Sequence, residues 1–326
     1  MAHTWLKYAM ERQDCEILGL CDIIPERAQR MKEEYELDCA VFDNIEKALA
    51  AGLEFNLVLD CTTPESHEYI VTTALKANCN VFGEKPMAAT REEALNEIKT
   101  ADACGKRYSV MQNRIYLPGM RALRKAVDEK VIGSIGYIGS DFFIGAHFGG
   151  FRDLMDNVLI LDMAIHTFYQ AQFIINSNPV SVYCHEFNPP GSWYKGPASA
   201  VAIYEFENGA VYSYQGSWCA EGHNTSWECD WRICGELGSI KWDGANAPIA
   251  HITKPQSTGF TRPYDEHVLP LLNEDAPQSH LGCFEEMFAA LEEDRPAETD
   301  SHYNYYSMNM VYGAIESAKY QKKVYL

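Results

Sequence analysis

Short apolar runs alternate with helical patterns in the first third of the chain. Five runs read as buried strands: 16–21, 39–42, 55–61, 80–86 and 107–113. Helical patterns follow them, with Pro25 in the first turn of one, and with Thr90 and Glu93 forming a capping box at the start of another that Gly105 closes. Strands that alternate with helices predict right-handed βαβ crossovers and a doubly wound parallel sheet.

The pattern changes after about residue 116. A helix at 118–129, a strand at 135–145 and a long apolar helix at 157–175 precede several neighbouring strand runs, and Asn208-Gly209 between two of these predicts a type I′ hairpin. Helices at 279–293 and 302–320 end the chain. We therefore predict an α/β protein with a Rossmann-like dinucleotide-binding domain at 1–116. An α+β domain at 117–326 would have an open, largely antiparallel sheet with helices on one face.

Length and charge limit the classes of partner. The chain has 326 residues, enough for two domains, and 27 basic against 46 acidic residues give a net charge of −19. This excess argues against nucleic acid and anionic membranes as partners. No apolar run approaches ~18 residues, and the first fifteen residues contain no signal-peptide core. We expect a cytoplasmic protein.

The eleven cysteines include no CxxC pair, and several lie in apolar strand-like runs, such as Cys21 and Cys61. Buried free thiols in a reducing compartment are therefore favoured over disulfides, and a zinc site is not expected. No metal is predicted anywhere.

The start of the first domain is unusual. A dinucleotide-binding domain normally begins with a strand, a glycine-rich turn and a helix, and an acidic residue follows about 20 residues later. Asp22 occupies the place of that acid, so residues 3–13 correspond to the first helix, and the sequence contains no GxGxxG. The central strand of the sheet is missing, which leaves its neighbours unpaired or forces them to close across the gap.

Two explanations compete for this feature. We favour Met1 being an internal methionine mistaken for a start, or a residue of a longer chain. The alternative is a chain that lives without the strand and binds its cofactor weakly or not at all.

Two groups of residues carry candidate chemistry. Glu84-Lys85-Pro86 ends a parallel strand, where ligands of such sheets bind, although a surface lysine in a turn is an equal alternative. Asp162 and His166 are four residues apart on an apolar helix, and so share one face. A carboxylate beside an imidazole raises its basicity and fixes its tautomer, but spacing alone favours a structural pair.

Two further segments lie where ligands bind in such folds. The turn Thr62-Thr63-Pro64-Glu65-Ser66-His67 links a strand to a helix, so its backbone N–H groups can approach a phosphate or ribose, or simply begin a capped helix. Asn113 and Arg114 lie at the predicted domain junction, where Arg114 binds a ligand or forms an interdomain salt bridge. Four tryptophans suggest sheet packing, the safer interpretation, or a sugar-stacking surface: Trp193, Trp218, Trp227 and Trp231.

With these residues in this order along the chain, the sequence resembles the Gfo/Idh/MocA oxidoreductase family, which includes glucose–fructose oxidoreductase and inositol dehydrogenase. The resemblance runs nearly end to end, from Asp22 through TTPESH, NVFGEKP and QNRIY to LDMAIH and the final helices. The EKP and D-x-x-x-H motifs are weak singly and specific in combination. The family's fold is similar to the one predicted above.

The resemblance implies hydride transfer between NAD(P) and a hydroxyl-bearing carbon of a sugar, inositol or related polyol. Lys85 matches a lysine that contacts nicotinamide ribose and the reacting hydroxyl, and His166 matches the acid/base that Asp162 orients. Glu84 and Asn113 would lie near the nicotinamide. Arg114 would lie near the substrate, as would Lys85, Asp162 and His166. Asp22, which no basic residue follows immediately, would bind the adenosine ribose and favour NAD over NADP.

Three alternative functions are consistent with these residues and with the resemblance. The first is an NAD-dependent dehydrogenase or reductase of a polyol. The second is a redox-assisted glycosidase in which the cofactor is not consumed. The third is a non-catalytic sugar-binding or regulatory protein, which the missing glycine loop favours and the retained Lys85, Asp162 and His166 argue against. A homodimer or homotetramer through the C-terminal sheet is expected from the resemblance.

Overall fold

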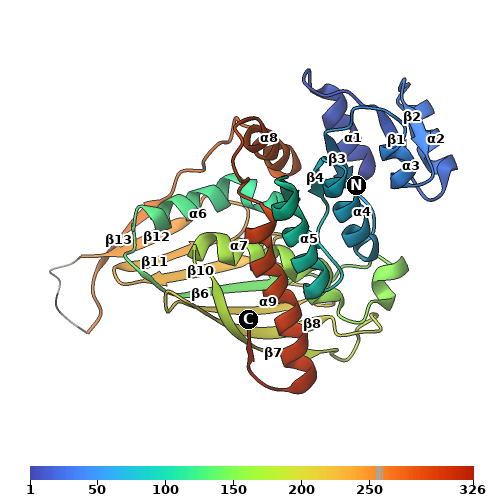
Figure 1. Cartoon of the computed structure of the whole chain (residues 1–326). Helices are drawn as coiled ribbons and strands as arrows, with labels where there is room; N and C mark the ends of the chain where they lie inside the picture. The colour runs from blue at the N-terminus through green and yellow to red at the C-terminus, as the bar shows by residue number, and fades with distance from the viewer. Residues whose placement is uncertain (255–257, 259) are drawn as a thin grey trace. The chain divides into compact units, whose positions relative to one another are not determined.

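The computed structural model describes residues 1–254, 258 and 260–326. The chain divides into two compact units (Figure 1). Unit 1 comprises Met1–Met111 and Phe284–Tyr305, and unit 2 comprises Gln112–Cys283 and Tyr306–Leu326. The boundary at residue 116 between two independent domains stays a prediction.

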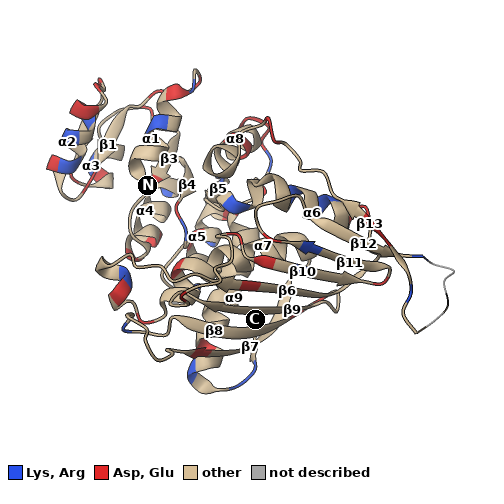
Figure 2. Cartoon of the chain, turned by 180° about the vertical axis from the view of Figure 1, so that it is seen from behind, with Lys and Arg blue, Asp and Glu red and all other residues tan. Residues whose placement is uncertain are grey.

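Unit 1 follows the predicted alternation of strands and helices. Its elements before residue 112 are α1 (Ala2–Glu11), β1 (Gly19–Cys21), α2 (Pro25–Glu34), β2 (Ala40–Phe42), α3 (Ile45–Leu49), β3 (Leu57–Asp60), α4 (Pro64–Lys76), β4 (Asn80–Gly83), α5 (Arg91–Cys104) and β5 (Tyr108–Val110). Pro25 occupies the first turn of α2, as predicted, and both acidic and basic residues lie along this surface helix (Figure 2).

The strands of unit 1 form two separate parallel sheets. One pairs β1 with β2 and the other has the order β3-β4-β5. Among the described residues no ladder joins β1 to β3, the two strands that a central strand would separate. Leu57 and Val58 of β3 are only half-buried, whereas Val81 of β4 is fully buried. The predicted Rossmann-like alternation of parallel strands and helices is therefore confirmed, and β1 and β3 are not paired with each other in the described part of the chain.

Aromatic packing attaches α1 to the later segment of unit 1. The Trp5 ring meets Phe284 edge-on at 4.8 Å, and Tyr8 stacks on the same ring at 4.5 Å. The Tyr8 hydroxyl also donates to Glu285. Aromatic pairs of this kind add to the stabilisation from burial alone. Residues distant in sequence thus complete the core of unit 1.

The predicted limits of α5 are also confirmed. The Thr90 hydroxyl accepts a hydrogen bond from the Glu93 backbone N–H at 3.2 Å, which satisfies a free donor of the first turn. Gly105 ends the helix in the left-handed region at φ 60°, where glycine avoids the steric cost of a Cβ.

Unit 2 contains one nine-stranded sheet in the order β13-β12-β11-β10-β6-β9-β8-β7-β14, antiparallel except for the parallel pair of β6 and β9. Its strands are β6 (Ile135–Phe143), β7 (Pro179–Phe187), β8 (Ser199–Phe206), β9 (Val211–Ser217), β10 (Asp230–Gly235), β11 (Gly238–Trp242), β12 (Ile249–Thr253), β13 (Tyr264–Val268) and β14 (Val324–Tyr325). The open, largely antiparallel sheet is as predicted.

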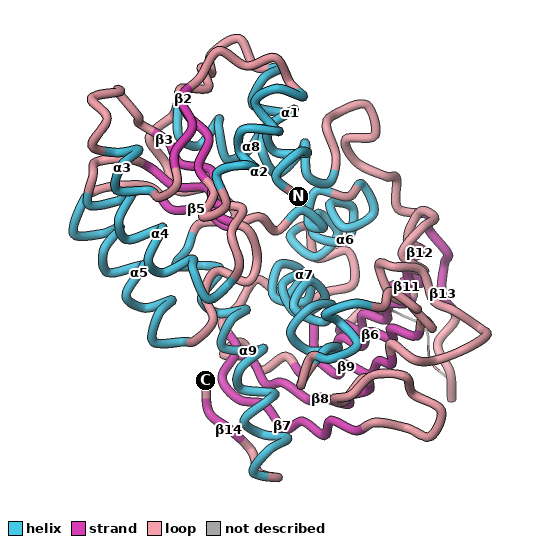
Figure 3. The backbone as a smooth tube through the Cα atoms, turned by 90° about the vertical axis from the view of Figure 1, so that its right-hand side faces the viewer, coloured by secondary structure: helices cyan, strands magenta, loops and turns pink. Residues whose placement is uncertain are grey.

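The helices α6 (Pro118–Asp128), α7 (Ile165–Ile175) and the unit 2 part of α9 (Ser301–Tyr320) lie on one side of this sheet (Figure 3). The helix α8 (Ser279–Glu292) begins in unit 2 and continues into unit 1. Phe168 of α7 packs edge-on against Tyr204 and Tyr214 of the sheet. Buried and exposed residues alternate along β8, so the opposite face of the sheet stays uncovered.

Two local predictions need correction. The hairpin between β8 and β9 is present, but only Gly209 has a positive φ, and Phe206 pairs with Ala210 across a three-residue loop. This pattern is typical of a type I turn with a glycine bulge, so the predicted type I′ turn is wrong. The apolar helix begins as a π-helical segment, Leu159–Ala164, before α7. One π-helical turn leaves the spacing of the apolar residues nearly unchanged. The hydrophobic periodicity of the sequence therefore does not distinguish this turn from an α-helix.

Across the part of the chain that the structure describes, no helix combines the length and apolar character that a membrane crossing requires.

Candidate functional site

The carboxyl ends of the strands in unit 1 hold most of the predicted cofactor-binding residues. Asp22 directly follows β1, and its Oδ1 accepts a hydrogen bond from the Ile24 backbone N–H at 2.8 Å. This turn fixes the carboxylate at the strand end, and Asp22 is only half-buried. A ribose hydroxyl can therefore still reach its oxygens.

Hydrogen bonds to the Asp60 carboxylate stabilise the turn after β3. Asp60 accepts from the backbone N–H and the hydroxyl of Thr62, at 3.0 and 2.7 Å. Thr63 precedes α4 without capping it through its side chain, and Pro64 begins the helix. The structure therefore leaves the first turn of α4 without the side-chain cap that the alternative interpretation of this turn required.

His67 lies beneath the same turn and is fully buried. Its Nδ1 lies 2.9 Å from the Pro86 carbonyl oxygen, and its Nε2 lies 3.1 Å from that of Thr62. Both ring nitrogens are thus engaged with backbone, which links the turn after β3 to the turn after β4. This contact holds the two turns together.

Glu84 and Lys85 directly follow β4, and the peptide bond between Lys85 and Pro86 is cis. Burial raises the pKa of the Glu84 carboxyl, and the backbone N–H and the ammonium of Lys85 partly offset this. The Lys85 N–H lies 3.2 Å from Glu84 Oε2. Lys85 itself is half-buried. A cation is thus held next to a buried acid at the edge where ligands of parallel sheets bind.

Unit 1 fits a dinucleotide at this edge. Asp22 follows β1 and the turn that begins α4 follows β3, so both lie at the carboxyl ends of parallel strands. A helix N-terminus favours phosphate, and Asp22 would accept from a ribose. These residues therefore match the two ends of an adenosine diphosphate group.

Unit 2 holds the predicted acid/base pair. Asp162 lies in the π-helical segment and His166 in the first turn of α7, so four residues separate them within one continuous helical run. The Asp162 side chain is 13% exposed and forms an ion pair with Arg152, whose Nε lies 2.5 Å from Oδ2. The carboxylate is therefore balanced by a cation that the sequence analysis did not identify.

Arg114 is held by contacts within unit 2. Its guanidinium lies 3.3 Å from Glu228 Oε1 and also donates to the Trp227 carbonyl. Burial raises the pKa of Glu228, and Arg114 opposes this shift. The neighbouring Asn113 donates to the Ser279 hydroxyl at 2.9 Å. Arg114 therefore forms a salt bridge within its own unit, and this pair is not the interdomain salt bridge that was considered for it.

The tryptophans divide into two kinds. Trp218 and Trp231 are each 2% exposed, which confirms packing for these two. Trp227 is 44% exposed and its ring lies 6.1 Å from that of Phe148. Trp193 stacks on His147. Packing therefore accounts for Trp218 and Trp231 and leaves Trp227 at the surface.

Unit 1 also contains a buried acidic pair that was not among the candidate residues predicted from the sequence. Asp60 and Glu97 are at most 1% exposed, and burial followed by the charge of Asp60 raises the pKa of Glu97 to about 9. A signal was present, because Glu97 lies on the same helical stripe as Ala94 and Ala101. No such signal marked Arg152, which lies outside any periodic segment.

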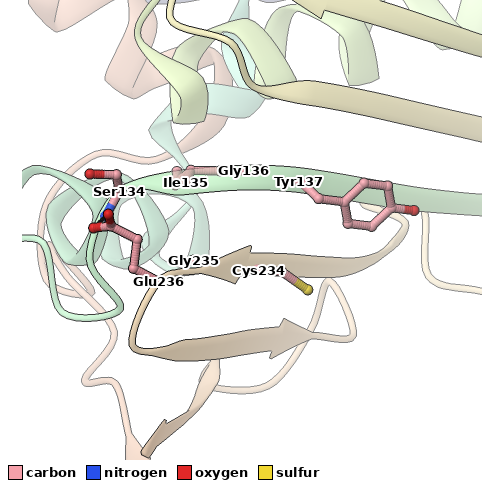
Figure 4. A pocket seen from close by; sticks show the side chains of 7 residues that line it. All are labelled: Ser134, Ile135, Gly136, Tyr137, Cys234, Gly235 and Glu236. Carbon is pink, nitrogen blue, oxygen red and sulfur yellow. Dashed lines mark hydrogen bonds between the residues drawn. The ribbon is translucent and has the colours of Figure 1, made fainter. Parts of the chain in front are cut away.

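A shallow hollow of about 480 Å³ in unit 2 lies between β6 and β10 (Figure 4). The register of these strands shifts between Cys234 and Gly235, a bulge that leaves Gly136 in open space. None of the predicted site residues lines it. The hollow is therefore a consequence of sheet irregularity and is separate from the candidate site.

Fold and site together define a protein with a Rossmann-type unit and an open-sheet unit that carries an Asp–His pair. The model of the "oxidoreductase family, NAD-binding Rossmann fold" matches residues 1–112, and the model of the "GFO/IDH/MocA C-terminal domain" matches residues 120–241. The chain belongs to the GFO/IDH/MocA family of oxidoreductases. The predicted family is thus confirmed, as is NAD as the cofactor of its Rossmann fold.

Relatives with assigned names are similar over part of the chain. An inositol 2-dehydrogenase of Rhizobium meliloti is 26% identical over 178 residues, 52% of this chain and 50% of that protein. A D-glucoside 3-dehydrogenase of Escherichia coli is 26% identical over 229 residues, 63% of each chain. The chain therefore spans less than two thirds of either relative.

Solved structures support the fold over the whole chain. An oxidoreductase of Agrobacterium radiobacter, determined with NAD+, L-tartaric acid and magnesium, superposes with a TM-score of 0.85 at 19% identity. The superposition covers 99% of this chain and 95% of that one. At this identity the similarity establishes the fold alone.

Proposed function

We propose that this protein is an NAD-dependent oxidoreductase that transfers a hydride between nicotinamide and a hydroxyl-bearing carbon of a sugar, inositol or related polyol. The observation that carries the proposal is that one chain matches both domains of the family and keeps Lys85, Asp162 and His166. The names of the relatives, an inositol dehydrogenase and a glucoside dehydrogenase, support the substrate class.

The proposed roles follow from the chemistry of each side chain. NAD supplies a hydride-accepting ring when bound. His166 takes the hydroxyl proton of the substrate as the hydride leaves its carbon, so that a carbonyl forms, and Asp162 orients the imidazole. Lys85 stabilises the negative charge that develops on the reacting oxygen. Arg114 contacts the substrate.

Cofactor binding is assigned to the strand ends of unit 1. Asp22 accepts from the adenosine ribose, which favours NAD over NADP, and the turn of Thr62, Thr63 and Pro64 approaches the dinucleotide through its backbone. Glu84 and Asn113 lie near the nicotinamide. For His67 we now propose an indirect role, because both of its ring nitrogens already contact carbonyl oxygens.

A second candidate is a non-catalytic sugar-binding or regulatory protein. The observation that favours it is the separation of the two sheets of unit 1, since a Rossmann fold normally binds its dinucleotide around a joined sheet. The redox-assisted glycosidase stays a further prediction, which cleavage of a glycoside without net formation of NADH would support. The cytoplasmic location also stays a prediction.

The test begins with NADH binding to the whole chain, measured by nicotinamide fluorescence, followed by turnover of polyols with NAD. We expect His166→Ala to abolish turnover and to leave the affinity for NADH nearly unchanged, because the imidazole acts on the substrate proton. The exposed His267 provides a control, and His267→Ala should retain turnover. Full activity of His166→Ala would contradict the acid/base role, and folded protein without NADH affinity would favour the second candidate.

We also propose a homodimer or homotetramer through the uncovered face of the sheet in unit 2. Tyr183 and Ile203 are cross-strand neighbours on this face and are 49% and 47% exposed, with Val201 (44%) beside them. Exposed apolar patches of this kind mark protein–protein interfaces. Light scattering of the purified chain should give at least the dimer mass, and Ile203→Glu should shift it toward the monomer. A monomer at micromolar concentration would contradict this proposal.

A further inference from the structure

The segment before the π-helical turn places a cation on Asp162. Gly149 and Gly150 both have positive φ angles, 69° and 71°, and a short 3₁₀ turn (Gly150–Leu154) follows them. This turn carries Arg152 to Asp162, where Nε and Oδ2 are 2.5 Å apart. Because glycine tolerates positive φ at little cost, the local backbone permits this approach.

Two phenyl rings lie close to the Arg152 guanidinium. The Arg152 guanidinium carbon lies 5.0 Å from the centre of the Phe148 ring and 4.8 Å from that of Phe151. The Arg152 side chain is 33% exposed and that of Asp162 only 13%. Cation–π contacts and partial removal of water make this ion pair stronger than one at the open surface. The surrounding residues therefore stabilise the ion pair between Arg152 and Asp162.

The backbone alone does not determine where the Asp162 carboxylate points. Asp162 lies within the wide π-helical turn, and an aspartate side chain in a helix has more than one staggered rotamer. An arginine that donates to one oxygen selects one of them. The other arginine close to this run, Arg114, contacts Met163 and Glu228.

We propose that Arg152 is a positioning residue, which acts through Asp162 to orient the carboxylate that serves His166. This inference rests on the proposed function, because it requires His166 to act on a substrate proton. Arg152 does not itself touch the reacting atoms. Its removal should therefore lower the rate of the chemical step and leave substrate binding nearly intact.

The experiment is a double-mutant cycle in the full chain with NAD and a polyol substrate. We expect Arg152→Met to lower kcat at least tenfold with KM changed less than threefold. In the Asp162→Asn background the same substitution should cause no further loss, because the positioned carboxylate is already gone. Arg152→Lys should restore a large part of kcat. Equal losses from Arg152→Met in both backgrounds would show a general packing role and overturn the proposal.

A matched control exists in the same unit. Arg124 pairs with Asp128 at 2.9 Å and stacks on Phe173 at 5.1 Å, so it repeats the chemistry of Arg152 away from Asp162. Arg124→Met should leave kcat within twofold of the native value. A tenfold loss in this variant as well would assign the effect to lost packing and contradict the proposal.

Failure of the proposed function is recognised separately, because the native chain would then show no hydride transfer at all. In that case crystal structures of the native protein and of Arg152→Met test whether Arg152 positions the Asp162 carboxylate. We expect the Asp162 carboxylate to change rotamer in the variant. An unchanged Asp162 would overturn the positioning role whatever the activity.

Discussion

Glu97 of unit 1 and the pair Glu228 and Asp162 of unit 2 are carboxyl groups that burial accommodates in different ways. In unit 1 Glu97 is fully buried, no salt bridge to it is seen among the described residues, and burial followed by the charge of Asp60 raises its pKa to about 9. In unit 2 the largely buried side chain of Glu228 is paired with Arg114, and that of Asp162 with Arg152. A proton neutralises Glu97, whereas guanidinium groups balance Glu228 and Asp162.

This difference predicts that the two units respond to different perturbations. A carboxyl group neutralised by a proton is sensitive to pH. A carboxylate balanced by an arginine is sensitive to loss of that partner, because a buried uncompensated charge is costly. Three substitutions test the comparison.

The largest loss of stability at constant pH is expected for Arg114→Met. Glu228 would then lie buried without its cation, and removal of one partner of such a pair costs about 3–5 kcal/mol. Urea unfolding at constant pH measures the loss. Addition of Glu228→Gln to this variant should recover most of it, because no charge is then left buried. If the double variant were as unstable as Arg114→Met, the loss would come from other Arg114 contacts.

Glu97→Gln should change the pH dependence of stability. Glu97 keeps its proton in the folded state up to its pKa of about 9, whereas in the unfolded chain the group titrates near 4.5. The folded state therefore binds more protons in this window, so the contribution of Glu97 to stability is fully present below pH 4.5 and falls by roughly 1.4 kcal/mol per pH unit as the pH rises toward 9. The free energy of unfolding from urea titrations at several pH values should lose this slope in Glu97→Gln.

The control for this prediction is Glu92→Gln, which removes an exposed carboxylate from the same helix. It should leave the slope between pH 5 and 9 unchanged. An identical pH dependence in native protein and Glu97→Gln would mean that Glu97 is ionised in the folded state, and the contrast between the units would then fail.

The smallest effect is expected for Lys195→Met. Lys195 pairs with Asp156 at 3.3 Å, but the two side chains are 65% and 83% exposed. Water screens such pairs, so the free energy of unfolding should change by about 0.5 kcal/mol or less. A loss comparable to that of Arg114→Met would show that pairing matters in unit 2 irrespective of burial.

Local sequence signals predicted most of the fold. Thr90 and Gly105 marked the limits of α5, and the apolar alternation of β8 marked a strand with one covered face. These signals work because capping and pleating depend on neighbours in the chain. The type I′ turn at Asn208-Gly209 failed because a loop one residue longer uses the same dipeptide with a different backbone.

The candidate site was predicted in part. Lys85, Asp162 and His166 carried recognisable spacing, and their proposed roles await the tests above. Arg152 could not be predicted, because it lies ten residues from Asp162 in a segment without periodicity. Glu228 is likewise 114 residues from its partner Arg114. No local rule connects such residues.

The sequence by itself determined the alternation of strands and helices and the family to which the chain belongs. These follow from short-range periodicity and from motifs that are read residue by residue. Only the tertiary structure decided that β1 and β3 remain unpaired, that Glu97 needs a proton, and that Arg152 and Arg114 balance their acids. The free energy of a buried charge depends on the groups that surround it, and folding brings those groups from distant parts of the chain.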